Sequence, residues 1–261
     1  MKTIRTEQDS RGVATLWLDR PEKRNAMSAT MIAELTSAAR DLGAASDVRA
    51  VVLAAEGNVF CAGGDLAWMQ EQMAADSETR KREARSLAMM LKALNELPKP
   101  LIARVHGNAF GGGLGLMSVA DVVVAVEGTT FGLTETRLGL IPATIGPYVI
   151  ARMGEARARR VFFSGRLFNA DEARELGIVS RIVPADELDA AVEQEVEPYF
   201  MAAPGAVAAA KDLVRVLGPD VGVAEISASI DALVECWEGD EARAGTEAFF
   251  AKRRANWMPD T

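Results

Sequence analysis

Two glycine-rich stretches have the residue types and spacing that could stabilise a developing negative charge. Ala62-Gly63-Gly64 and Gly111-Gly112-Gly113 each follow an apolar run, and each precedes a helical pattern. Glycine lets a ligand approach the backbone closely, and the first turn of a helix has N–H groups without intrahelical partners. Two such donors are what an oxyanion hole requires, and one is typically worth about 2.7–4 kcal/mol in the transition state. The stretches therefore predict an anion-stabilising site, with tight strand-to-helix crossings as the alternative.

Glu135 is the candidate for proton transfer. It follows the turn at Phe131-Gly132, and Arg137 is the only basic residue close to it in the sequence. Burial raises the pKa of a carboxyl group, and a pKa near the working pH suits general acid–base catalysis. The alternative is a solvated loop glutamate.

Other common chemistries lack their residues. His106 is the only histidine, which argues against a Ser–His–Asp triad and against a multi-histidine metal site, and we interpret His106 as a structural residue. Cys61 is interpreted as a small buried residue rather than a nucleophile. The sequence has no G-x-S-x-G, H-E-x-x-H or P-loop motif, and the glycines at 111–115 do not complete a dinucleotide fingerprint.

Composition narrows the class of protein further. A net charge of −8 over 261 residues argues against nucleic acid and anionic membranes as partners. No apolar run approaches the ~20 residues of a membrane span, and the N-terminus resembles no signal peptide or presequence. Two distant cysteines suit a reducing compartment. We expect a cytoplasmic protein.

Hydrophobic periodicity predicts an α/β protein with helices at its C-terminal end. The expected strands are 13–18, 50–54, 101–105, 121–126 and 178–183. The expected helices are 28–43, 77–97, 143–152, 155–163, a segment from Asn169 to Gly177, and everything from about 186 onward. The polar residues 70–82 are expected to form a loop.

Three segments resemble the signature segments of the crotonase (enoyl-CoA hydratase/isomerase) superfamily, and the similarity spans nearly the whole chain. They are Phe60–Asp65, His106–Gly113 and Phe131–Glu135. The resemblance implies a spiral of β-β-α turns over residues 1–197 and a helical oligomerisation subdomain over 198–261. It also implies a homotrimer, often a dimer of trimers.

The resemblance also implies an acyl-CoA thioester as substrate, with coenzyme A as part of the substrate and no separate cofactor or metal. The backbone N–H groups of Gly64 and Gly112 would hold the thioester oxygen as it becomes an enolate. The residues implied in binding the substrate or its CoA portion are Arg24, Ala26, Ala62, Asp65, Leu66, Trp68 and Lys252.

Two positions depart from the superfamily pattern. Gly115 stands where hydratases of the two-glutamate type have a glutamate, so Glu135 alone would both activate water and protonate Cα. Ala67 stands where many relatives have lysine, which removes one CoA contact. The finer pattern around 65–70, 110–116 and 133–144 resembles bacterial 3-methylglutaconyl-CoA and isohexenylglutaconyl-CoA hydratases. Their substrates have a distal carboxylate, for which Arg137 is a candidate partner.

Three functions follow as hypotheses. The first is a hydro-lyase that adds water to a 2-enoyl-CoA with a branched, glutaconyl-type acyl group. The second is a Δ3,Δ2-enoyl-CoA isomerase, which needs a single glutamate. The third is an acyl-CoA-binding or RNA-binding protein with vestigial chemistry. The acyl preference would depend on Trp68, Met69, Met90, Tyr148 and segment 70–82.

Overall fold

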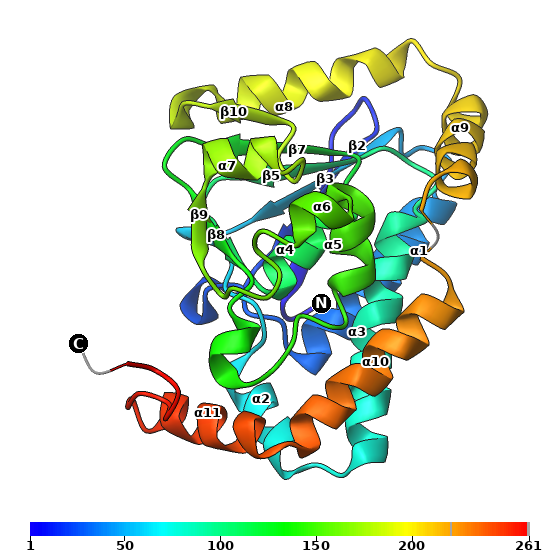
Figure 1. The fold of residues 1–261 in the computed structure, drawn as a ribbon. Helices are drawn as coiled ribbons and strands as arrows, with labels where there is room; N and C mark the ends of the chain where they lie inside the picture. Colours follow the sequence, from blue (N-terminus) through cyan, green and yellow to red (C-terminus); the bar gives the residue numbers. More distant parts are fainter. Residues whose placement is uncertain (220, 260–261) are drawn as a thin grey trace.

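Two sheets run through the protein, and successive β-β-α units contribute one strand to each. The computed structural model describes residues 1–219 and 221–259. The larger sheet has the strand order β1-β2-β3-β5-β7-β10, and the smaller has β4-β6-β8-β9. Strands β1 and β9 are antiparallel to their neighbours, and the other pairs are parallel. The predicted α/β spiral of β-β-α turns is confirmed (Figure 1).

The strands of the larger sheet are β1 (Ile4–Gln8), β2 (Val13–Leu18), β3 (Ala50–Ala55), β5 (Leu101–Val105), β7 (Val122–Val126) and β10 (Arg181–Val183). Those of the smaller sheet are β4 (Val59–Cys61), β6 (Asn108–Phe110), β8 (Thr130–Gly132) and β9 (Leu167–Asn169). The helices of the spiral are α1 (Ala29–Ala44), α2 (Leu66–Ala74), α3 (Ser77–Asn95), α4 (Gly112–Ser118), α5 (Gly146–Met153), α6 (Glu155–Ala158) and α7 (Ala170–Glu175). They are followed by α8 (Leu188–Val196), α9 (Pro204–Leu217), α10 (Val223–Glu238) and α11 (Asp240–Phe250).

The larger sheet is covered on both faces, which explains its nearly continuous apolar strands. Val52 and Ile102 belong to the cluster on one face, which α8 covers with Leu188 and Val192. The opposite faces of the strands belong to the main core, together with α1, α3, α4 and α5. In Figure 1, α8 crosses above the sheet and α10 runs beside α3 below it. The sheet thus gives rigid support to the loops at its strand ends.

Two of the C-terminal helices, α10 and α11, pack on the spiral. Ile226 and Ile230 of α10 pack on Ala84 and Ala88 of α3, and α11 packs on the 3-10 helix η2 (Glu135–Leu138). No helix within 1–219 and 221–259 is long and apolar enough to cross a bilayer.

Several element predictions need correction. The segment 70–82 is not a loop, because α2 extends through Ala74. The helix predicted from residue 77 is confirmed as α3, which Asp76 caps by accepting a hydrogen bond from the Thr79 N–H (2.8 Å). The predicted strand 178–183 is reduced to β10, and the predicted helix 155–163 ends at Ala158. Strands of only three residues build the smaller sheet, which periodicity could not reveal because so short a run shows no repeat.

Candidate active site

A wide cavity and a deep pocket meet at the residues that the sequence proposed for catalysis. The wide cavity has a volume of about 940 Å³, and the deep pocket has about 130 Å³. Gly64, Gly112 and Glu135 line both of them. A molecule that extends from the cavity into the pocket must therefore pass these three residues.

The local backbone leaves the Gly64 N–H free at this junction. Met27 forms a parallel bridge with Gly64, in which the Met27 N–H donates to the Gly63 carbonyl (2.8 Å) and the Asp65 N–H donates to the Met27 carbonyl (2.9 Å). These bonds hold the residues on either side of Gly64 and leave its own N–H unused. Across residues 1–219 and 221–259 that N–H finds no acceptor.

Gly112 supplies a second N–H beside the first. It is the first residue of α4, where an N–H has no intrahelical acceptor, and it donates to no other described residue. A Cβ placed on Gly63 would lie 3.8 Å from the Gly112 nitrogen, so the two stretches approach closely. Two unpaired donors at one junction are what an oxyanion hole requires, so the assignment of Gly64 and Gly112 to this role stays a prediction that the geometry permits.

Glu135 brings a carboxyl group to the same place. It begins η2, and although the residue is half-buried, its Oε2 is inaccessible and has no hydrogen-bond partner in the described structure. Burial raises the pKa of Glu135 to about 7, against the small lowering effect of a hydrogen bond from its own N–H. A carboxyl group with this pKa can both accept and return a proton near neutral pH.

The raised pKa predicts opposite effects of pH on activity and stability. If Glu135 acts as a base, kcat/KM should fall as the pH drops through about 7. The folded state keeps the Glu135 proton to a higher pH than an unfolded chain does, because the ordinary pKa of a glutamate side chain is 4.5. This contribution to stability is present below pH 4.5 and is lost as the pH rises through 7. A kcat/KM profile and urea unfolding across pH 5–8 measure both, and in Glu135→Gln both dependences should disappear. An acid limb that persists in this variant would contradict the assignment.

The place of the second glutamate is filled by apolar side chains. Gly115 is buried in α4. A Cβ on it would lie 2.6 Å from Ile145 Cγ2 and 3.4 Å from Leu91 Cδ1. Even a methyl group is therefore too large here, and Glu135 is the only carboxyl group among the described residues that line the deep pocket.

We accordingly expect Gly115→Ala to destabilise the protein by about 1–3 kcal/mol through overpacking. In an Ile145→Ala background the same substitution should cost clearly less, because the clashing Cγ2 is gone. Urea unfolding of the four proteins of this double-mutant cycle measures the difference. Equal costs in both backgrounds would show that Ile145 is not the obstacle.

Most of the residues predicted to bind CoA line the wide cavity. They are Arg24, Ala26, Ala62, Asp65 and Leu66. Arg24 and Asn25 have positive φ angles (52° and 53°). The buried Asn25 side chain fixes this turn by donating to the carbonyls of Glu56 (2.8 Å) and Val59 (2.9 Å).

Asp65 also has a structural task. Its Oδ1 caps α2 by accepting from the Ala67 N–H (2.9 Å) and the Trp68 N–H (3.3 Å), and its Oδ2 accepts from Arg20 (3.0 Å). Burial would raise the pKa of Asp65, but these bonds outweigh it and lower the pKa. Arg20 also donates to the Ala26 carbonyl (2.9 Å), which ties the 24–26 turn to the start of α2.

Other candidate residues lie elsewhere. Lys252 is not among the residues that line the wide cavity, whereas Arg253 is. Arg137 lines the wide cavity but not the deep pocket. Trp68 and Met69 line the deep pocket as expected. Met90 is in the core, and the Tyr148 hydroxyl donates to the Ala88 carbonyl (2.8 Å), so neither shapes the pocket.

Cys61 and His106, which we interpreted from the sequence as non-catalytic, both have structural surroundings. Cys61 is fully buried, and burial raises the pKa of its thiol to about 12. A ring nitrogen of His106 is 3.0 Å from the Gly57 carbonyl, which fixes the end of β5 to the loop between β3 and β4.

Sequence analysis missed the contribution of α11. Gly245, Ala248 and Phe249 of this helix line the wide cavity. A Cβ on Gly245 would lie 2.4 Å from the Leu138 carbonyl oxygen, so α11 and η2 are in close backbone contact. Helical periodicity identified the helix, but only the fold brings it to the segment that carries Glu135.

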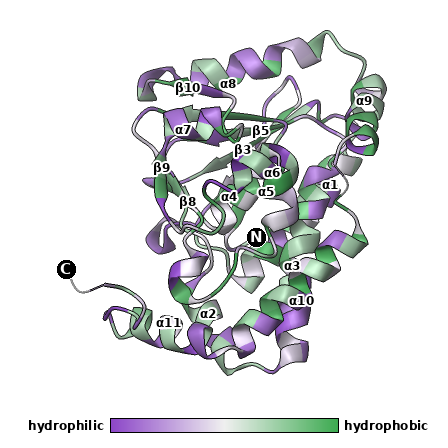
Figure 2. Cartoon of the chain, viewed as in Figure 1, coloured by the Kyte–Doolittle hydropathy of each residue, from purple (hydrophilic) through white to green (hydrophobic). Residues whose placement is uncertain are grey.

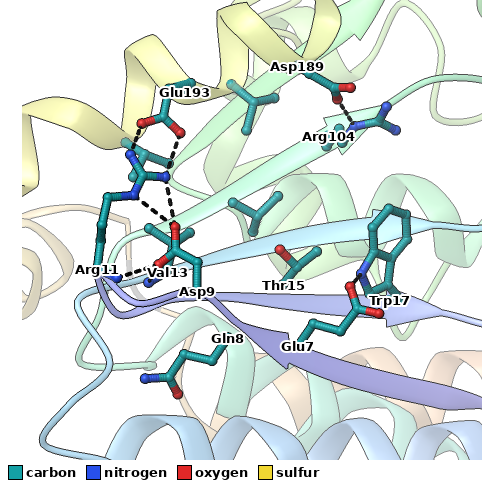
Figure 3. A pocket seen from close by; sticks show the side chains of 13 residues that line it. Glu7, Gln8, Asp9, Arg11, Val13, Thr15, Trp17, Arg104, Asp189 and Glu193 are labelled. Carbon is teal, nitrogen blue, oxygen red and sulfur yellow. Dashed lines mark hydrogen bonds and ion pairs between the residues drawn. The ribbon is translucent and has the colours of Figure 1, made fainter.

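A third hollow, between β2 and α8, is shown in Figure 3. It has several charged side chains, but they pair with one another. Arg104 binds Asp189 (2.6 Å), and Arg11 binds both Asp9 and Glu193. The floor includes Val13 and the hydroxyl residue Thr15. Because its charges are neutralised, this hollow offers no chemistry comparable to that of the Glu135 site.

Known proteins resemble this chain in sequence and in fold. The family model described as "Enoyl-CoA hydratase/isomerase" matches residues 8–260. The chain is 35% identical over 243 residues to a Thermus thermophilus protein named "Putative enoyl-CoA hydratase", covering 92% of this chain and 95% of that protein. A Mycobacterium avium enoyl-CoA hydratase structure superposes with a TM-score of 0.85 at 30% identity, covering 99% of this chain and all of the other. Pseudomonas aeruginosa AtuE superposes with a TM-score of 0.79 at 35% identity, covering 98% and 99%.

Proposed function

Because the chain belongs to the enoyl-CoA hydratase/isomerase family, we propose that it is an enoyl-CoA hydratase, a lyase that adds water to a 2-enoyl-CoA thioester. The observation that carries this proposal is the meeting of two free N–H donors and one buried carboxyl group at the junction of the cavity and the pocket. Acyl transfer would need a nucleophile, and the Cys61 thiol is too deeply buried to serve as one.

The geometry suits hydration in two proton transfers. The ionised Glu135 carboxylate takes a proton from water as the water oxygen bonds to Cβ, and the double-bond electrons move to the thioester oxygen. The N–H groups of Gly64 and Gly112 stabilise this enolate where its charge develops. Glu135 then returns the proton to Cα, which regenerates the carboxylate. One carboxyl group thereby performs both steps, which its pKa of about 7 permits.

The size of the deep pocket favours a short acyl group. Its volume of about 130 Å³ is slightly below that of a protein cavity of about 150 Å³ that binds benzene. A 3-methylglutaconyl group, with a branch and a distal carboxylate, comes closer to this size than the considerably longer isohexenylglutaconyl chain. We propose the shorter, branched glutaconyl type as the preferred substrate.

A turnover screen tests the activity and the preference together. The panel comprises crotonyl-CoA, 3-methylglutaconyl-CoA and a long-chain 2-enoyl-CoA, with loss of the enoyl thioester absorbance and mass spectrometry as readouts. We expect a product heavier by one water, with the highest kcat/KM for 3-methylglutaconyl-CoA. Failure to hydrate any member would refute the hydratase proposal, and a preference for the long chain would refute the size argument.

A Δ3,Δ2-enoyl-CoA isomerase is the second candidate, favoured by the apolar filling around Gly115, which leaves a single carboxyl group. Incubation with a 3-enoyl-CoA separates the two. An isomerase stops at the 2-enoyl product, whereas a hydratase continues to the 3-hydroxy product.

We further propose assembly as a homotrimer or a dimer of trimers in the cytoplasm. The support is α9, none of whose residues is buried. Its apolar Val214, Val216 and Leu217 are each more than 70% exposed, and green marks such residues on this helix in Figure 2. An apolar patch of this kind is typical of a protein interface.

Introducing charge into this patch should prevent assembly. We expect Val214→Glu/Leu217→Glu to sediment as a monomer, while the wild type and the control Asp212→Ala sediment as three or six chains. The cost of burying two unpaired carboxylates explains the loss. Analytical ultracentrifugation measures it, and an unchanged assembly would exclude α9 from the interface.

A further inference from the structure

The deep pocket has one cation in an otherwise largely apolar wall. Among the described residues that line it, Arg80 is the only basic one, and Glu135 is the only acidic one. Gly64, Gly112 and Glu135 also line the wide cavity, but Arg80 does not. Arg80 therefore lies beyond the junction, on the side that the acyl group of a bound thioester would enter.

The Arg80 guanidinium is held in place by neutral groups. Its Nε donates to the Gln72 carbonyl (2.9 Å), and Nη2 donates to the Met73 carbonyl (3.1 Å), both in the last turn of α2. The carbon Cζ of Arg80 lies 5.7 Å from the ring centroid of Trp237 in α10. An arginine has five N–H donors, so three remain for another partner.

No acidic side chain within residues 1–219 and 221–259 forms an ion pair with Arg80. Asp76, one turn before it, caps α3 through Thr79; the positive charge of Arg80 helps to lower the pKa of Asp76, but the two form no ion pair. Glu83, one turn after it, accepts from the Trp68 indole (3.5 Å) and lies 3.7 Å from Arg82. A guanidinium that forms no ion pair and lies beside a largely apolar pocket is a place for an anionic group of the ligand.

Gln72 adds a polar group to the same wall. The residue is 5% exposed and lines the deep pocket. Its side-chain amide makes no hydrogen bond with any described residue. The amide is not among the fully buried atoms that lack a partner, so it is open to the pocket and can form a hydrogen bond with a ligand there.

We propose that Arg80, assisted by the Gln72 amide, binds a carboxylate at the distal end of the acyl group and selects dicarboxylic 2-enoyl-CoA thioesters. This rests on the proposed function for the placement of the acyl group, and it assigns the carboxylate to Arg80 rather than to Arg137. The guanidinium fork matches the two oxygens of a carboxylate.

Matched substrates test the selection. We would compare 3-methylglutaconyl-CoA with 3-methylpent-2-enoyl-CoA, which has the same carbon skeleton without the carboxylate. Arg80→Gln should lower kcat/KM for the carboxylated substrate about 10- to 150-fold, the equivalent of one hydrogen bond to a charged group. For the neutral substrate kcat/KM should stay within about threefold. Arg80→Lys should recover part of the loss, because lysine keeps the charge without the fork.

Arg82→Gln is the control, since Arg82 lies on the same helix with its side chain 65% exposed. It should leave both substrates unchanged. An equal loss of kcat/KM for both substrates in Arg80→Gln would show that Arg80 only stabilises the end of α2, and it would overturn the proposal. Loss of the preference in Arg137→Gln but not in Arg80→Gln would also overturn it.

A binding measurement separates this inference from the hydratase proposal. Isothermal titration with the saturated thioesters 3-methylglutaryl-CoA and 3-methylpentanoyl-CoA requires no turnover. Weaker binding of the former alone in Arg80→Gln supports carboxylate selection, even if the wild type hydrates nothing. Unchanged binding of both overturns the selection, even if the wild type is an active hydratase.

Discussion

Replacing Glu135 with glutamine is expected to lower kcat for hydration by about 10⁴-fold, the upper end of the range for a single acid–base group. The large effect follows from the double role of this carboxyl group. Ile145 and Leu91 fill the place where a second glutamate would stand, so no other described side chain in the deep pocket can take the proton. Steady-state hydration of 3-methylglutaconyl-CoA measures the loss.

Binding and folding should survive this substitution. Glutamine has nearly the same shape as glutamate, and the oxyanion donors belong to the backbone of other residues. We therefore expect an unchanged Kd for a saturated acyl-CoA. Glu127→Gln, at an exposed position after β7, is the matched control and should keep full activity. Unchanged turnover in Glu135→Gln would remove this residue from the mechanism.

Gly111→Ala is expected to damage both stability and activity. Gly111 has φ 47° and ψ −115°, a region that L side chains rarely adopt, and such strain costs of the order of 1–3 kcal/mol. An added Cβ would also lie 2.9 Å from Glu135 Oε1. The Gly111 carbonyl accepts from the Leu114 N–H (2.9 Å), so relief of the strain would move the first turn of α4 and with it the Gly112 N–H.

Loss of one oxyanion donor lowers kcat by about 10²- to 10³-fold, and we expect kcat/KM of Gly111→Ala to fall at least that far. Gly128→Ala is the control for backbone strain, because Gly128 has φ 77° but no atom within 4 Å of an added Cβ. It should lower the midpoint of urea unfolding and leave kcat/KM unchanged. Full activity in Gly111→Ala would show that α4 does not position the oxyanion hole.

The residues that meet at the junction of the two cavities could be predicted from the sequence better than their surroundings. Gly64, Gly112 and Glu135 belong to short sequence motifs, which can be recognised without knowledge of the fold. The long buried strands β2, β3 and β5 can be recognised as continuous apolar runs in the sequence. The smaller sheet escaped prediction because its strands have three residues each. The position of Arg80 could not be foreseen, because residues from α2 and from α10, more than 140 positions later, define its environment.

The close contact of Gly245 with Leu138 has a consequence for biosynthesis. Translation completes both sheets at Val183, but Asp240, where α11 begins, emerges much later. Domains begin to fold while synthesis proceeds at about 5–20 residues per second, so the nascent spiral can pack its core for several seconds before α11 docks. During that interval the wall beside Glu135 is open to water, and a ribosome-bound intermediate would be folded and yet inactive. Catalytic competence is thus acquired after the core has formed, as a late step in the maturation of the chain.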